Sequence, residues 1–294
     1  MTAERTLAPA GEAGGAETAI RVRGLRRAYG GHRAVDGLDL DVRRGEIFAL
    51  LGPNGAGKTT TTEILEGYRS RDAGEVAVLG VDPARAGSRW RARIGIVLQE
   101  SADVSGLTVR ESVRHFAHYY PRPRDPDEVI EAVGLTDRRD TRAGALSGGQ
   151  RRRLDVALGI LGGPELLFLD EPTTGFDPEV RRRFWALIAG LRAAGTTILL
   201  TTHYLDEAEH LADRVGVIRA GRVVDVDTPE RLGGRHLARS VLRWRDAEGT
   251  HELDTAEPTV DVARLAARFG GEVPELTVTR PSLEDVYLDL IGAR

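Results

Sequence analysis

The glycine-rich segment at residues 52–59 constrains the fold more than any other part of the chain. An apolar run at 46–51 precedes it, and a stretch with helical character at 59–66 follows it. A strand, a phosphate-binding loop and a helix are therefore predicted, with backbone N–H groups and the helix N-terminus facing an anion. The segment fits the pattern G-x-x-x-x-G-K-[ST] with Gly52, Pro53, Asn54, Gly55, Ala56, Gly57, Lys58 and Thr59.

Lys58 and the two threonines after it are the predicted ligand-binding groups of this loop. Lys58 would reach the β- and γ-phosphates of a nucleotide, the Thr59 hydroxyl would bind Mg²⁺, and Thr60 would line the same site. Lys58 is the single lysine among 41 basic residues. Because a compact ammonium and a planar guanidinium are not interchangeable at a tight phosphate site, the retained lysine supports this prediction.

Composition limits the classes of protein to which the chain can belong. The 294 residues are 41% hydrophobic, enough for a full core, and the net charge of −4 gives no reason to expect a nucleic-acid partner. The absence of cysteine excludes a disulfide-stapled fold. Residues 1–18 lack the features of a signal peptide and are expected to form a disordered tail. No apolar run approaches the ~18 residues of a membrane span, so any membrane role is expected to come through a partner.

Strand and helix patterns alternate over residues 19–233, which predicts an α/β domain with a largely parallel sheet. Short strands are expected at 20–23 and 37–42, and buried parallel strands at 166–169 and 197–200. A helical subdomain is expected over about 100–162. From residue 234 to 294 the pattern changes to strand, strand, helix, strand and helix, which predicts a small α+β appendix.

Two carboxylates, Asp170 and Glu171, follow the apolar run at 166–169. A buried strand that ends beside the phosphate loop would let Asp170 hold a magnesium-bound water. Glu171 could then accept a proton from an attacking water. A buried strand ending in surface acids is common, but the phosphate loop upstream favours the functional interpretation.

A second anion-binding device is predicted at residues 146–150, which read Leu-Ser-Gly-Gly-Gln and open an Arg-rich helical stretch. A plain helix cap is the simpler alternative. The pentapeptide is highly specific when it occurs together with the other motifs. It resembles the signature motif of the nucleotide-binding subunits of ABC transporters and matches it without a substitution. The resemblance covers about residues 20–232 and implies a P-loop NTPase cassette with a mostly parallel sheet, N-terminal antiparallel strands and a helical subdomain. The signature residues expected to contact nucleotide are Ser147, Gly148, Gly149 and Gln150.

The resemblance assigns roles to four further residues. Gln99 matches the family's Q-loop glutamine, which touches magnesium and the attacking water, and His203 matches the switch histidine at the γ-phosphate. Tyr29 matches the aromatic residue that stacks on adenine. Asp177 matches the D-loop aspartate, although Phe176 replaces the leucine common before it. The implied catalytic set is Lys58, Gln99, Glu171 and His203, and the implied Mg²⁺ ligands are Thr59, Gln99 and Asp170.

The family mechanism explains why one chain carries two anion-binding devices. They are expected on opposite sides of a subunit, so a single copy cannot close both on one ATP. The resemblance implies a head-to-tail homodimer, in which Ser147 and Gly149 of one copy meet the γ-phosphate held by Lys58 of the other. ATP binding would close this dimer and hydrolysis would open it.

Two functional classes compete within this family: the motor of a membrane transporter and a soluble ABC ATPase of DNA repair or translation. Fewer than 50 residues separate Gln99 from Leu146, too few for the coiled coil of repair types, and translation types usually carry two cassettes. The motor is therefore favoured. Residues 64–80 and 281–287 resemble bacterial ABC-2-type exporters such as the daunorubicin-resistance ATPases.

The resemblance to ABC-2-type exporters implies a separate transmembrane subunit that chooses the cargo: a drug, antibiotic, lipid or polysaccharide. The expected location is the cytoplasmic face of the cell membrane. Arginine clusters at 151–153 and 181–183 have no interleaved aromatic residues, so they are expected on solvated helix faces rather than on nucleic acid.

Overall fold

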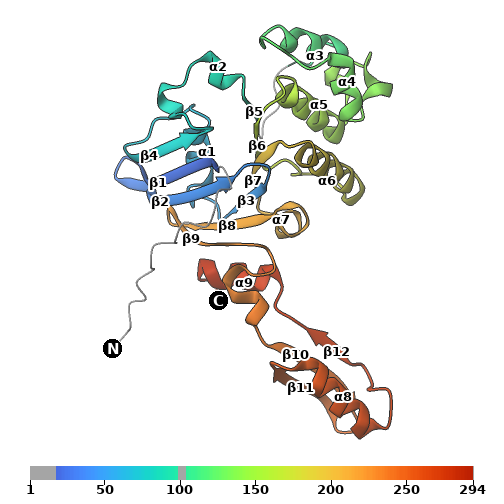
Figure 1. Ribbon diagram of the computed structural model, residues 1–294. Coiled ribbons are helices and arrows are strands. Elements are labelled where there is room, and N and C mark those ends of the chain that lie inside the picture. The colour runs from blue at the N-terminus through green and yellow to red at the C-terminus, as the bar shows by residue number, and fades with distance from the viewer. Residues whose placement is uncertain (1–17, 99–103, 294) are drawn as a thin grey trace.

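The computed structural model describes residues 18–98 and 104–293 (Figure 1). Gln99 and residues 1–17 of the predicted tail lie outside this range, whereas Thr18 already belongs to the first strand. Among the described residues, no helix combines the length and the apolar character needed to cross a bilayer. The strands are β1 (Thr18–Tyr29), β2 (His32–Arg43), β3 (Ile47–Leu51), β4 (Ala73–Val78), β5 (Ile94–Val97), β6 (Leu166–Asp170), β7 (Thr197–Thr201), β8 (Arg214–Arg219), β9 (Arg222–Asp227), β10 (Ser240–Asp246), β11 (Gly249–Thr255) and β12 (Thr277–Thr279). The α-helices are α1 (Lys58–Leu65), α2 (Ser88–Arg91), α3 (Val109–Ala117), α4 (Pro126–Ala132), α5 (Gly148–Ile160), α6 (Pro178–Ala193), α7 (Leu205–Leu211), α8 (Pro258–Phe269) and α9 (Leu283–Ile291).

A six-stranded sheet in the order β5-β6-β7-β3-β8-β9 forms the centre of the molecule. All neighbouring pairs are parallel except β8 with β9. Every residue of β3 and β7 is buried, because both faces of the sheet are covered. Along β6, Leu167 and Leu169 enter one hydrophobic core, and Leu166 and Phe168 enter the other. The predicted α/β fold with a mostly parallel sheet is confirmed.

An antiparallel sheet in the order β2-β1-β4 covers one of these cores (Figure 1). Strands β1 and β2 have twelve residues each and are much longer than the short strands predicted at 20–23 and 37–42. Their register shifts at several bulges, which interrupts the alternation of apolar and polar residues. The sequence pattern therefore reveals only the regular parts of this hairpin.

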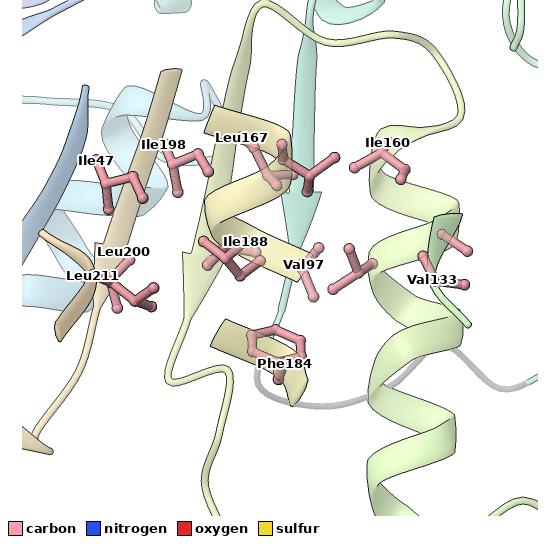
Figure 2. Close-up of a cluster of buried hydrophobic side chains, with 14 of the residues drawn as sticks. Ile47, Val97, Val133, Ile160, Leu167, Phe184, Ile188, Ile198, Leu200 and Leu211 are labelled. Carbon is pink, nitrogen blue, oxygen red and sulfur yellow. The ribbon is translucent and has the colours of Figure 1, made fainter. Parts of the chain in front are cut away.

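Helices α3, α4 and α5 occupy the stretch for which a helical subdomain was predicted, and they share the other core with the parallel sheet (Figure 2). Val133 and Ile160 from this layer lie in the same cluster as Leu167 of the sheet (Figure 2). Helix α5 approaches β5 so closely that a Cβ on Gly95 would overlap the carbonyl oxygen of Gly159. This contact fixes α5 against the central sheet.

The C-terminal stretch 234–293 packs in two parts. The sheet β11-β10-β12 and α8 enclose a small core of their own, made by Leu242, Trp244, Leu265 and Val273. Helix α9 instead returns to the central domain, where Leu283 joins the core beneath the parallel sheet. The predicted α+β elements are all present, but the last helix stabilises the cassette rather than the small sheet (Figure 1).

Replacing Leu283 by alanine should test this docking of α9. Leu283 is only 1% exposed, so Leu283→Ala should lower the free energy of unfolding of the cassette by about 2–5 kcal/mol. Urea unfolding followed by the fluorescence of Trp90 and Trp185, in a Trp244→Phe background, measures the change. Leu265→Ala in the small core is the matched control and should leave this transition unchanged. Equal midpoints for the two variants would contradict the assignment.

Candidate nucleotide-binding and catalytic site

A cavity of about 520 Å³ opens over the loop between β3 and α1. The loop supplies most of its wall, and the N-terminal hairpin and the loop after β6 complete it. Eight predicted site residues, from three separate segments of the chain, thus share one cavity. The lining residues are Tyr29, His32, Ala34, Asn54, Gly55, Gly57, Lys58, Thr59, Thr60 and Glu171.

The loop backbone turns in a way that only glycine allows at two positions. Gly55 has φ 77° and Gly57 has φ 107°, both in the left-handed region. A Cβ on Gly57 would overlap the carbonyl oxygen of Ala34, and one on Gly52 would overlap that of Ile218. The loop is therefore pressed between β2 and β8, and its N–H groups are presented with α1 directly behind them.

Lys58 is buried within this loop. Its Nζ donates hydrogen bonds to the carbonyl oxygens of Gly52 at 2.6 Å and Pro53 at 3.2 Å. Burial lowers the pKa of Lys58 from its usual value, while the nearby carboxylates of Glu171 and Asp170 act in the opposite direction. The ammonium is thus held at the loop, facing the two acids at the end of β6.

Asp170 ends β6, and its carboxylate is fixed from the neighbouring strand β7. The Thr201 hydroxyl donates a hydrogen bond to Asp170 Oδ1. The hydroxyl also lies within hydrogen-bonding distance of the Glu171 N–H group, at 3.3 Å. Thr201 was not among the predicted site residues, although its place at the end of a buried strand beside β6 was a usable signal.

Glu171 has a backbone conformation that is rare for a residue with a side chain. Its φ is 43°, and its N–H donates to the Thr201 carbonyl oxygen at 3.0 Å. Strain of this kind persists only where the surrounding structure enforces it, and such positions cluster at functional sites. His203 Nδ1 lies 3.3 Å from Glu171 Oε1. The carboxylate is therefore aimed at the cavity with an imidazole beside it, which suits a proton acceptor.

The signature segment forms a separate site on the same chain. Ser147 is the N-cap of α5, and it makes a reciprocal capping box with Gln150. Gly148 has open space where a Cβ would stand, whereas a Cβ on Gly149 would lie 2.5 Å from Val180 Cγ1. None of these residues lines the cavity of Lys58. A second cavity of about 370 Å³ adjoins them, lined by Gly148, Arg151, Arg152, Glu171, Pro172, Thr174, Gly175 and Phe176.

Asp177 caps α6 by accepting hydrogen bonds from the N–H groups of Glu179 and Val180 at 3.0 and 2.8 Å. Phe176, which replaces the family's usual leucine, packs edge-on against Phe184 of α6 at a centroid distance of 5.7 Å. The larger side chain is thus accommodated by an aromatic partner, and the cap at Asp177 is formed beside it.

Arg152 departs from its prediction. The cluster 151–153 was expected on a solvated helix face, but Arg152 is buried at 7% exposure. It shares a helix face with Asp155 and Gly159, three and seven residues further on, and this face packs against the sheet. Burial lowers the pKa of Arg152, with Asp155 and Asp170 acting in the opposite direction. The helical spacing was the signal that could have found it.

Glu207 is a second buried charge that the sequence interpretation missed. It lies four residues after His203 and has no exposed surface. The Trp185 indole donates a hydrogen bond to Glu207 Oε1 at 3.3 Å. Burial raises the pKa of Glu207, because desolvation disfavours the carboxylate. The residue ties α7 to α6 behind the loop that carries His203.

Comparison with known proteins identifies the family. The family model described as ABC transporter matches residues 35–174. The chain is 40% identical to the daunorubicin resistance ATP-binding protein DrrA2 of Streptomyces coeruleorubidus, over 94% of this chain and 96% of that protein. It belongs to the ATP-binding subunits of ABC transporters. It is also 39% identical to the Nod factor export ATP-binding protein I of Ralstonia nicotianae, over 95% of this chain and 81% of that one.

These relatives match this chain over more than nine-tenths of its length, and they confirm the prediction of an ATP-hydrolysing subunit of an ABC exporter. They do not support the alternative of a soluble ABC ATPase in DNA repair or translation. Solved structures give the same fold. An ATP-binding subunit of an ABC transporter superposes with a TM-score of 0.69 at 23% identity, covering 93% of this chain and 99% of that one. A dimeric bacterial ABC transporter cassette superposes with a TM-score of 0.64 at 21% identity, over 71% of this chain and 98% of that one.

Exchanging Lys58 for arginine should abolish ATP turnover although the charge is kept. The Nζ group sits between two loop carbonyls in a space that a planar guanidinium does not fit. We expect kcat to fall by about 100-fold or more, the size of effect seen when one group that stabilises transition-state charge is removed. Steady-state phosphate release measures this. Arg114→Lys, at an exposed position of α3, is the matched control, and turnover near the wild-type rate in Lys58→Arg would refute the role of Lys58.

Proposed function

We propose that this chain hydrolyses ATP with Mg²⁺ in the cavity of Lys58, with Glu171 as the acceptor of the proton of the attacking water. The observation that carries the proposal is the strained Glu171, which lines the same cavity as Lys58 and lies 3.3 Å from His203. Lys58 and the loop N–H groups bind the phosphates, Tyr29 stacks on the base, and His203 contacts the γ-phosphate. Gln99 would contact the magnesium ion and the attacking water.

The residues present fit a magnesium ion. The Thr59 hydroxyl is exposed at the cavity, and Asp170 supplies a carboxylate oxygen from the end of β6. Hydroxyl and carboxylate oxygens are ligands that Mg²⁺ accepts while it keeps several waters. A bound ion would neutralise charge on the phosphates. Thr201 holds the carboxylate of Asp170 in place by its hydrogen bond.

We propose further that two copies act together, head to tail. Ser147, Gly148, Gly149 and Gln150 open α5, a helix of thirteen residues, but they lie outside the cavity of Lys58. The N-terminus of α5 therefore does not face the nucleotide of its own chain, and it can bind an anion from another molecule. A second copy would bring its γ-phosphate to Ser147, and Asp177 would lie near the same interface.

Glu171→Gln should trap this dimer. The amide keeps the shape of the side chain but cannot accept the proton, so ATP stays bound and the interface stays closed. Size-exclusion chromatography with saturating ATP and Mg²⁺ should show a species of twice the monomer mass, which reverts when the nucleotide is removed. The same variant carrying Lys58→Ala should remain monomeric. A Glu171→Gln chain that stays monomeric under these conditions would refute the head-to-tail arrangement.

A separate transmembrane subunit is the second proposed partner, and a groove beside β5 is its proposed docking site. A cavity of about 560 Å³ lies between β5 and helices α3 and α5. Two apolar side chains remain exposed there, Ile96 at 37% and Leu98 at 55%. Leu98 directly precedes Gln99 in the sequence. The remaining lining residues are Glu66, Arg91, Ile94, Val97, Phe116, Tyr120, Asp155, Leu158 and Gly159.

The charge of the groove indicates what kind of segment fits it. Burial raises the pKa of Glu66 to about 8, with Asp170 and Glu63 adding to the shift. A cation placed against Glu66 would offset this cost of desolvation. Apolar walls around a buried acid therefore suit an amphipathic segment with a basic residue among apolar ones. We propose that the transmembrane subunit supplies this segment on the cytoplasmic side of the membrane.

Export of a drug, antibiotic, lipid or polysaccharide is the proposed transport reaction, with the transmembrane subunit selecting the cargo. The relatives named above support this choice, since one is named for daunorubicin resistance and another for Nod factor export. The chain would then be a peripheral protein at the cytoplasmic face of the cell membrane.

Ile96→Arg should prevent docking in this groove. The substitution places a cation on an apolar wall and fills the space that the proposed segment needs. We expect the tagged variant to lose the multi-span membrane polypeptide that wild type recovers from detergent-solubilised host membranes, as identified by mass spectrometry. Leu237→Arg, at a 78% exposed position away from the groove, is the matched control and should retain that polypeptide. Undiminished recovery with Ile96→Arg would refute the docking site.

A further inference from the structure

The guanidinium of Arg152 connects two segments of the catalytic region through three of their backbone carbonyl groups. Its Nη2 donates a hydrogen bond to the carbonyl oxygen of Asp170 at 2.7 Å, and its Nε donates to that of Pro172 at 3.1 Å. Its Nη1 donates to the carbonyl oxygen of Leu98. The Asp155 carboxylate lies 4.0 Å from Nη1. One side chain thus contacts the backbone at the ends of β5 and β6.

A buried cation in this position is costly for the fold. Transfer of a guanidinium out of water carries a penalty of several kcal/mol, which carbonyl oxygens only partly offset. An apolar side chain of similar volume would pack against the same sheet without this penalty. Unlike an apolar side chain, the planar guanidinium donates hydrogen bonds to three carbonyl groups and holds them in one fixed arrangement.

The backbone of Arg152 lies near the signature segment, whereas its guanidinium lies beside Glu171 at the other proposed site. Its backbone lies in α5, five residues after Ser147, and the helical hydrogen bonds, beginning with that from the Arg151 N–H to the Ser147 carbonyl oxygen at 2.8 Å, connect the two positions. Its guanidinium holds the carbonyl oxygens of Asp170 and Pro172, the residues on either side of Glu171. A displacement of Ser147 is therefore transmitted directly to the backbone that sets the strained conformation of Glu171.

We propose that Arg152 is a positioning residue that couples the two nucleotide sites of the dimer. When Ser147 of one chain engages the γ-phosphate held by its partner, α5 is drawn toward that nucleotide. Arg152 carries the shift to the backbone around Glu171 of its own chain, and so aligns the proton acceptor at the other site. This inference rests on the head-to-tail dimer proposed above.

Mixed dimers of the full chain provide the test. Copies with two different affinity tags are combined with ATP and Mg²⁺, and doubly tagged dimers are isolated. One copy carries Glu171→Gln, so single-turnover hydrolysis occurs only in the cavity of the other copy. On the hydrolysing copy, Arg152→Met is then made with Ser147 intact and with Ser147→Ala, because Ser147 of that copy would engage only the partner's nucleotide. Arg152→Lys, which keeps the charge but not the fork, and Arg114→Met, at an exposed arginine of α3, are compared in both backgrounds.

We expect Arg152→Met to slow the single turnover by about 5- to 100-fold when Ser147 is intact, the usual range of a coupling between sites. In the Ser147→Ala background, where the turnover is already slow, Arg152→Met should add little. Arg152→Lys should restore only part of the rate, Arg114→Met should have no effect, and the ATP concentration giving half-maximal rate should change little. An equal loss with Ser147 intact and with Ser147→Ala would show a purely local structural role and overturn the inference. An unchanged rate on Arg152→Met would also overturn it. Failure to recover any doubly tagged dimer with Arg152 intact would instead refute the proposed dimer.

Discussion

Burial of both faces of the parallel sheet is the constraint on which the rest of the structure depends. Since β3, β6 and β7 run side by side in the same direction, their carboxyl ends meet at one edge. The phosphate loop leaves β3 there, Asp170 ends β6, and Thr201 ends β7. Ligands bind at this edge in open α/β sheets, because it is where polar groups can leave a fully apolar core. The phosphate loop, Asp170 and Thr201 are therefore brought together by strand pairing.

The sequence predicted the parts of the molecule whose function is encoded in short segments. The loop at 52–59, the carboxylates at the end of β6 and the segment 146–150 each depend on residue types at fixed spacing. The strands that carry the first two, β3 and β6, are continuous apolar runs. Features that depend on tertiary contact were not predictable in this way. The bulges of β1 and β2 hide their length, and the return of α9 depends on a binding surface formed by distant elements.

Arg152 shows the same limit at the level of one residue. Among the three consecutive arginines at 151–153, composition and charge give no reason to distinguish the middle one. Its partners are backbone carbonyls, which every residue has and which leave no trace in the sequence. Only the helical spacing from Arg152 to Asp155 and Gly159, with Gly159 packed against Gly95 of β5, places it on the buried face.

Lys58 and Arg152 are both buried cations held by backbone carbonyl groups, yet each position needs its own residue type. At Lys58 the loop closes so tightly that two carbonyls lie within reach of a single nitrogen, and the cation must also be free to turn toward a phosphate. At Arg152 three carbonyls from the ends of β5 and β6 must be held at once, which takes a rigid fork of donors. The chain has arginine, not lysine, at all its other Lys and Arg positions. A lysine therefore suits the phosphate loop, where a single nitrogen must turn toward a phosphate, and an arginine suits α5, where three carbonyl oxygens are bound at once.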